Sequence, residues 1–124
     1  MLPFSVQFQP GLPPYEQVVY AVRKAIVAGQ LQPGDRFPAV RTLSQKLRLN
    51  PNTAHKIVVA LTNEGLLEVR PGVGTVVAAP PRTPRGTQRA WLGAEIERLV
   101  VGARGLGLPL GEILEAVRAH WKKL

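Results

Sequence analysis

Apolar residues recur at helical spacing in three segments of the first half of the chain. Pro14 suits the first turn of the first segment, and Gly29 would end it. Asn50 is a favourable cap for the third segment, with Pro51 as its first residue. The pattern therefore predicts three helices. Their apolar positions are Tyr15, Val18, Val19, Val22 and Ile26 in the first, Val40, Leu43 and Leu47 in the second, and Ala54, Ile57, Val58 and Leu61 in the third.

Alternating apolar and polar residues predict strands before and after these helices. Residues 4–8 place Phe, Val and Phe between polar residues, which is the period of a half-buried strand. Residues 33–35, Pro-Gly-Asp, have the composition of a turn. Residues 67–69 and 73–77 would form two further short strands around a turn rich in glycine. The expected order is one strand, three helices and a hairpin.

The chain continues into a region of different composition. Residues 79–88 contain three prolines and no apolar periodicity, so we expect a linker between a domain at 1–78 and a region at 89–124. Two more helices are predicted there, separated near Gly105. Helices of about 15 residues cannot bury their own apolar faces, so they must pack on the first domain or on a second copy. We expect dimerisation through Trp91, Ile96, Leu99, Leu114, Val117 and Trp121.

The charge of the chain indicates a polyanionic partner. Its 124 residues, of which 45% are hydrophobic, allow one compact domain and a small appendage. The net charge is +8, and residues 1–78 and 79–124 each carry eight Lys or Arg against four Asp or Glu. Net charge also serves solubility, but an excess of this size is typical of proteins that bind nucleic acids.

Several functional classes lack support in the sequence. The chain has no cysteine, which excludes disulfides and thiolate metal sites. His55 and His120 are far apart and the carboxylates are not clustered, so we expect neither an enzyme nor a metal protein. Residues 72–74 lack the third glycine of a dinucleotide-binding fingerprint, and no cofactor is expected. With no signal peptide and no apolar run of ~20 residues, the protein is expected to be cytoplasmic, without a membrane partner.

The second and third predicted helices have the form of a helix-turn-helix, and the hairpin after them would be its wing. The polar start of the third helix can reach base edges in the major groove of DNA. Asn52 can form two hydrogen bonds with adenine, and Thr53 can reach a phosphate or a thymine methyl group. Lys56, one turn further, suits a phosphate or guanine. His55 is expected to be an exposed helix residue rather than a metal ligand.

A second group of residues would hold the DNA backbone. Arg36 precedes the second helix and Arg41 lies near its start, where a helix end can approach phosphates. Arg70, with Gly72 and Gly74, would lay the wing on the neighbouring backbone or minor groove, because glycine lets the main chain come close. Taken singly, each of these residues has a plainer interpretation as a solvated or turn residue. Their occurrence in this order favours DNA binding.

With these motifs in this order, the chain resembles the GntR family of bacterial winged-helix regulators. The resemblance covers residues 12–78. It implies a backbone contact by Arg41 and close approach of the wing glycines to the groove. It also implies base reading at the start of the third helix, and there it adds His55 to Asn52, Thr53 and Lys56. The matching segments are Tyr15–Gln17, Gly29–Leu43, Asn50–Thr53, Glu64–Leu67 and Gly72–Thr75.

Two positions depart from the family pattern. Ala39 stands where the family usually has a serine that caps the second helix, which should weaken that helix end by roughly 1 kcal/mol. Val58 stands where a tyrosine is common. The short tail resembles that of the YtrA-like subgroup, whose members pair through this region and are often repressors of transporter operons.

The sequence thus predicts a mainly α-helical protein with a small β-hairpin wing and a two-helix dimerisation tail. The predicted function is that of a sequence-specific transcriptional repressor, acting as a homodimer on a palindromic operator in double-stranded DNA. A non-specific or architectural nucleic-acid-binding protein is the alternative. A small-molecule effector would have room only in a groove between the tail helices or between domains, and no residue pattern identifies one.

Overall fold

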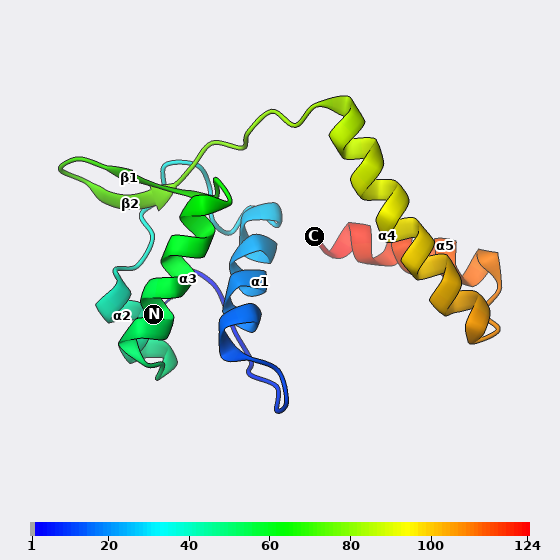
Figure 1. Ribbon diagram of the computed structural model, residues 1–124, viewed down its shortest axis with the longest axis horizontal. Helices are drawn as coiled ribbons and strands as arrows, with labels where there is room; N and C mark the ends of the chain where they lie inside the picture. Colours follow the sequence, from blue (N-terminus) through cyan, green and yellow to red (C-terminus); the bar gives the residue numbers. More distant parts are fainter. Residues whose placement is uncertain (1) are drawn as a thin grey trace. The chain divides into compact units, whose positions relative to one another are not determined.

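In residues 2–124, which the computed structural model describes, five helices and one β-hairpin follow one another along the chain (Figure 1). They divide into two compact units, with the boundary between Pro81 and Arg82. The predicted order of three helices, a hairpin and two tail helices is confirmed. The elements are α1 (Pro14–Val27), α2 (Val40–Leu47), α3 (Pro51–Asn63), β1 (Leu67–Arg70), β2 (Gly74–Val77), α4 (Arg85–Gly105) and α5 (Leu110–Lys123).

Helix α3 is the centre of the first unit and contacts α1, α2 and β1 (Figure 1). Ala54, Ile57 and Leu61 recur at helical spacing and are completely buried. Val58, which was expected in the same stripe, is half-buried at its edge. The core around them is completed by the buried side chains of Phe4, Val18, Val19, Val22, Ala25, Leu31, Phe37, Leu43, Leu67 and Val77.

The connection between α2 and α3 is short and hydrogen-bonded at both helix ends. Arg48 ends α2 in the left-handed conformation, with a φ of 53°. The Ser44 hydroxyl then donates to the Leu49 carbonyl oxygen over 2.7 Å. At the start of α3, the Asn50 side chain accepts a hydrogen bond from the backbone N–H of Asn52, at 2.8 Å, as the capping prediction required. These bonds hold the first turn of α3 at a defined angle to α2.

The hairpin pairs Leu67 with Val77 and Arg70 with Gly74 in an antiparallel register. A third segment lies on the other edge of β2. The Phe37 N–H donates to the Thr75 carbonyl over 2.9 Å, and the Val77 N–H donates to the Asp35 carbonyl over 2.8 Å. The turn predicted at residues 33–35 is therefore followed by a short stretch that pairs with β2 and attaches the wing to the residues before α2.

The predicted strand at residues 4–8 is wrong. The segment has no regular strand, and its apolar side chains differ in burial, since Phe4 is buried and Phe8 is 42% exposed. Phe4 stacks on Phe37 with ring centroids 5.8 Å apart. Further along, the Gln17 side chain accepts from the Gln9 N–H at 2.8 Å. Ring stacking and a hydrogen bond to a side-chain amide therefore hold this segment in place of the backbone pairing that a strand would make.

The tail differs from the first unit in how little it buries. Helix α4 begins at Arg85, so the last residues of the expected linker at 79–88 are helical. Pro84 occupies the N-cap position, and its carbonyl accepts from the Gln88 N–H at 3.0 Å. Ala103 is buried, while both tryptophans are exposed. Within residues 2–124, no helix combines the length and the apolarity needed to cross a membrane.

The uncapped start of α2 gives a stability prediction. Ala39 occupies the N-cap position with extended dihedral angles and no side-chain hydrogen bond. We expect Ala39→Ser to raise the free energy of unfolding by about 1 kcal/mol, because a serine oxygen can accept from a free N–H of the first turn. Urea denaturation of the full chain measures this. Ala79→Ser, at an exposed position outside the helices, is the control, and equal midpoints for both variants would contradict the prediction.

Candidate nucleic-acid interface

The first turns of α3 present polar side chains on the face opposite the core. Asn52, His55 and Lys56 are exposed, and their spacing of three and four residues places them on one side of the helix. His55 and Lys56 also line a shallow depression together with Tyr15 of α1. Thr53, which was expected to face outward, is half-buried beside the core stripe. The structure therefore groups three of the four predicted residues and leaves Thr53 at the border.

These side chains have their hydrogen-bonding groups available. In the described part of the chain, the side chains of Asn52, Thr53 and Lys56 form no hydrogen bond or ion pair with other residues. The Asn52 backbone N–H is satisfied by the Asn50 cap, so its side-chain amide is not needed for folding. A helix start with unpaired amide and ammonium groups can bind hydrogen-bonding edges and anions.

Two arginines lie around the start of α2. Arg41 is the second residue of this helix and is exposed. Arg36 is also exposed, and its backbone bridges to Val76 of β2. Arg36 further shares a shallow depression with Thr42 of α2. Sequence patterns contain no sign that Arg36 is attached to the wing, because that attachment comes from pairing between distant segments.

The wing ends in a tight turn. The Val73 N–H donates to the Arg70 carbonyl over 3.1 Å, with Pro71 and Gly72 between them. Gly72 has a φ of 78° and Gly74 a φ of 108°, values that side chains rarely allow. Both glycines are exposed. The second strand begins at Gly74, one residue later than predicted, because Val73 belongs to this turn.

Arg70 has an intramolecular partner that sequence analysis missed. Its Nε and one terminal nitrogen donate to the same oxygen of Glu68, over 3.0 and 2.8 Å. The two residues are separated by one position on β1, so their side chains project from the same face. The spacing of two residues between Glu68 and Arg70 on a predicted strand could have indicated this ion pair. The ion pair directs Arg70 back along the strand, and both side chains are about half exposed, so solvent weakens the pair.

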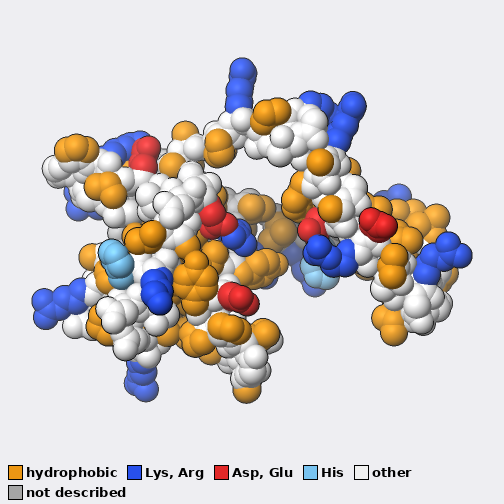
Figure 2. Space-filling view, in the orientation of Figure 1, with side chains coloured by type: hydrophobic (Ala, Val, Ile, Leu, Met, Phe, Trp, Pro, Cys, Tyr) orange, Lys and Arg blue, Asp and Glu red, His pale blue; other side chains and the backbone are white. Residues whose placement is uncertain are grey.

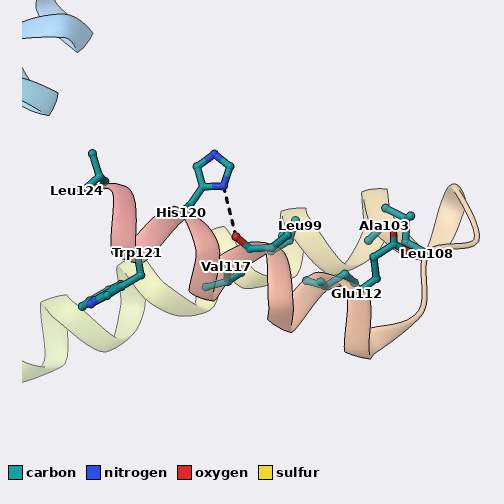
Figure 3. Close-up of a pocket in the computed structure, with 10 residues that line it drawn as sticks. Leu99, Ala103, Leu108, Glu112, Val117, His120, Trp121 and Leu124 are labelled. Atoms are coloured by element: carbon teal, nitrogen blue, oxygen red, sulfur yellow. Dashed lines mark hydrogen bonds between the residues drawn. The ribbon is translucent and has the colours of Figure 1, made fainter.

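The tail carries a separate apolar groove between α4 and α5, with a volume of about 440 Å³ (Figure 3). Leu99 and Ala103 come from α4, and His120 on α5 has its Nδ1 3.3 Å from the Ala116 carbonyl oxygen. All six predicted dimerisation residues are exposed within the chain. Of these, the groove includes Leu99, Val117 and Trp121.

A helix-turn-helix with an exposed polar recognition turn, followed by a hairpin with a basic glycine turn, defines the class of winged helix-turn-helix DNA-binding proteins. Residues 14–77 match the family described as bacterial regulatory proteins, gntR family. The chain therefore belongs to the GntR family and is a DNA-binding transcriptional regulator, not an enzyme.

Relatives extend the similarity into the tail. The chain is 28% identical over 116 residues to the HTH-type transcriptional repressor YtrA of Bacillus subtilis, covering 91% of this chain and 89% of YtrA. It is 30% identical over 112 residues to the uncharacterized HTH-type transcriptional regulator YhcF of the same organism, covering 90% and 93%. These nearly full-length matches assign the chain to the short YtrA-like subfamily.

Solved structures agree with the fold. A transcriptional antiterminator from Listeria monocytogenes superposes with a TM-score of 0.79 at 24% identity, covering 94% of this chain and 88% of that one. The structure of YtrA from Sulfolobus acidocaldarius, a GntR-family transcription factor, covers 97% of both chains with a TM-score of 0.57 at 24% identity. The DNA-binding domain of AraR in complex with operator ORX1 is 32% identical, covers 60% of this chain and 95% of that domain, and has a TM-score of 0.53.

The Glu68–Arg70 pair gives a prediction about DNA affinity. Glu68→Gln should strengthen binding to any duplex by up to about fivefold, because it removes a carboxylate that competes with DNA phosphates for Arg70. An ion pair this exposed contributes at most about 1 kcal/mol, which corresponds to about fivefold in affinity. Fluorescence anisotropy with a labelled duplex measures the dissociation constant. Glu97→Gln removes the same charge from an exposed site on α4 and is the control. Equal affinities of the two variants would show that Glu68 does not restrain the wing arginine.

Proposed function

We propose that this regulator is a homodimeric repressor that binds a palindromic operator through α3 and the wing. The repressor assignment is supported by the similarity to YtrA of Bacillus subtilis along most of both chains. The dimer is supported by the tail, whose large apolar side chains are left uncovered by the chain itself. Trp91 is 65% exposed and Trp121 is 82% exposed. Large apolar side chains left exposed in this way favour an interaction site on the tail.

A second copy is the occupant that we assign to this surface. A single recognition helix reads few base pairs, so selectivity needs two of them on one site. A two-fold dimer uses the same patch on both chains, so the exposed apolar side chains of α4 and α5 in each copy would cover those of the other. The operator would then contain two half-sites about 34–36 Å apart. We assign no small-molecule effector, because the partner would cover the groove between α4 and α5.

The roles of the recognition residues follow from their exposure and chemistry. We assign base reading chiefly to Asn52, whose amide can donate to and accept from adenine, with Lys56 and His55 on the same helix side. Thr53 is half-buried and would contact a phosphate or a methyl group at the edge of this surface.

Backbone contacts would come from the surrounding residues. Arg36 and Arg41 flank the start of α2, and Arg70 lies beside the exposed Gly72 and Gly74 of the wing. These contacts position the protein without choosing a sequence. A dimer would double the net charge of +8, so its affinity should fall steeply with salt. A regulator of bacterial DNA works in the cytoplasm, where we expect this protein.

Binding selection from a random duplex pool, followed by competition between the selected site and random duplex at fixed salt, tests the proposal. We expect Asn52→Ala to weaken binding to the selected site by about 1–3 kcal/mol and to relax one base position. Asn63→Ala, at the exposed far end of the same helix, is the control and should bind like the wild type. If the wild type bound the selected and random duplexes equally, the protein would be a non-specific binder.

Arg41 should behave differently from Asn52. We expect Arg41→Ala to weaken binding to selected and random duplexes by the same factor, because a phosphate contact carries no sequence information. The same competition assay measures both dissociation constants. Arg104→Ala, at an exposed arginine in the last turn of α4, is the matched control. A change in the ratio of the two constants would assign Arg41 to base reading instead.

The apolar groove of the tail gives a prediction about the oligomeric state. Val117→Asp should convert the dimer into a monomer and lower operator affinity, because it places a charge in the apolar groove. Sedimentation velocity measures the mass. Val27→Asp changes an exposed valine at the end of α1 and should leave the dimer intact. A Val117→Asp protein that still sedimented as a dimer would show that pairing uses another surface.

A further inference from the structure

Two valines at the outer end of the wing are exposed. Val69 on β1 is 69% exposed, and Val73 in the turn between the strands is 46% exposed. Pro71, which lies between them in sequence, is also exposed. Neither valine belongs to the core that the described residues form. Figure 2 shows hydrophobic side chains at the surface of the wing tip, which lies at the left of Figure 1.

The ordinary preference of strands for valine explains only one of the two. Leu67 and Val77 form a pair that is buried in the core, and Val69 and Thr75 form the next pair on the same side of the hairpin. Valine is common at such a strand position. Val73 lies between the strands, however, where turns usually have Gly, Pro, Asn, Asp or Ser. The fold therefore does not account for an apolar side chain at position 73.

The turn holds Val73 as a single apolar side chain at a narrow tip. Its N–H donates to the Arg70 carbonyl over 3.1 Å, and the φ of 78° at Gly72 fits a type II turn with Pro71 before it. Gly72 and Gly74 add no side chain on either side of Val73. A Cβ at either glycine would meet nothing within 4 Å, so the space around the tip is open. Because valine is branched at Cβ, its side chain has little rotational freedom.

The charge near the tip is directed away from it. Arg70 donates to Glu68 over 3.0 and 2.8 Å, back along β1. Residues 71–74 carry no charge. A tip that met DNA only at its phosphates would be served by a cation, since Lys and Arg supply most of that attraction. An apolar tip indicates contact with a less charged part of the duplex.

The tip is continuous with the surface that we assign to DNA. The wing and α3 belong to the same compact unit, and β1 packs against α3, so their relative placement is fixed. If α3 occupies a major groove, a hairpin at its side meets the adjacent minor groove. That groove is about 6 Å wide, half the width of the major groove. One side chain between two glycines is narrow enough to enter it.

We propose that Val73 inserts into the minor groove beside the recognition helix and selects A·T over G·C pairs there. The inference rests on the proposed function, because it needs α3 in the neighbouring major groove. Guanine places an amino group in the minor groove, whereas A·T pairs have only acceptors there. Valine covers this amino group without accepting its hydrogen bond, so a G·C pair would leave a buried donor unpaired. The wing would then contribute sequence information that its phosphate contacts cannot supply.

Inosine separates this contact from any contact in the major groove. An inosine·C pair has the major-groove edge of G·C but lacks the amino group in the minor groove. In the site obtained by binding selection, each A·T pair in turn is replaced by G·C and by inosine·C, and fluorescence anisotropy with the full chain gives the dissociation constants. At the pairs under the wing we expect G·C to weaken binding by about 5- to 100-fold, while inosine·C binds like A·T.

Val73→Ser should remove this difference, because a serine hydroxyl can accept a hydrogen bond from the guanine amino group. The G·C and inosine·C duplexes should then bind with a ratio of about one. The slope of log affinity against log salt should not change, since the substitution removes no cation. Val27→Ser changes an exposed valine at the end of α1 and is the matched control, which should keep the wild-type ratio.

Two results would overturn the inference. One is equal binding of the G·C and inosine·C duplexes by the wild type at every position, because the minor-groove amino group would then have no effect. The other is a Val73→Ser protein that keeps the wild-type ratio, because another residue would then detect this group. A wild type that preferred the selected site but ignored the amino group would contradict this inference alone. Equal binding of selected and random duplexes would contradict the proposed function.

Discussion

The burial of one face of α3 is the constraint on which the rest of the first unit depends. Ala54, Ile57 and Leu61 are completely removed from solvent between α1, α2 and β1. Burying an Ile or Leu side chain contributes about 1.5–3 kcal/mol, so a rotation of this helix about its axis would be strongly opposed. The orientation of Asn52 and Lys56 follows directly, because they occupy the opposite side of the same helix. The polar first turns of α3 are thus positioned by the core, and the side chains of Asn52 and Lys56 have no hydrogen-bond partner in the described residues.

The wing depends on a different kind of interaction. Two short strands alone are marginally stable in water, and here the residues before α2 add backbone hydrogen bonds to the outer edge of β2. This pairing connects Arg36 to the wing, while α2 begins a few residues later with Arg41 near its start. Arg36 and the wing therefore share one hydrogen-bonded frame. Glu68 restrains Arg70 within that frame through an ion pair that is half exposed to solvent.

The two units satisfy their apolar residues in different ways. The first unit buries its large aliphatic side chains within one chain, while α4 and α5 bury Ala103 and leave their tryptophans exposed. A pair of helices has too little volume to enclose a core of its own. The tail consequently leaves large apolar side chains uncovered by the chain itself.

Local patterns in the sequence determined most of the elements. Helical spacing, the Asn50 cap and the Pro-Gly turn at 71–72 each act between residues close in the chain, so α1 to α3, the hairpin and both tail helices were predictable. The predicted strand at residues 4–8 failed because alternation cannot show whether a partner edge exists. Gln17 and Phe37 hold that segment instead, from elsewhere in the chain. The pairing of residues 35–37 with β2 and the half-buried position of Thr53 were likewise decided by the tertiary structure, because both depend on packing between segments distant in sequence.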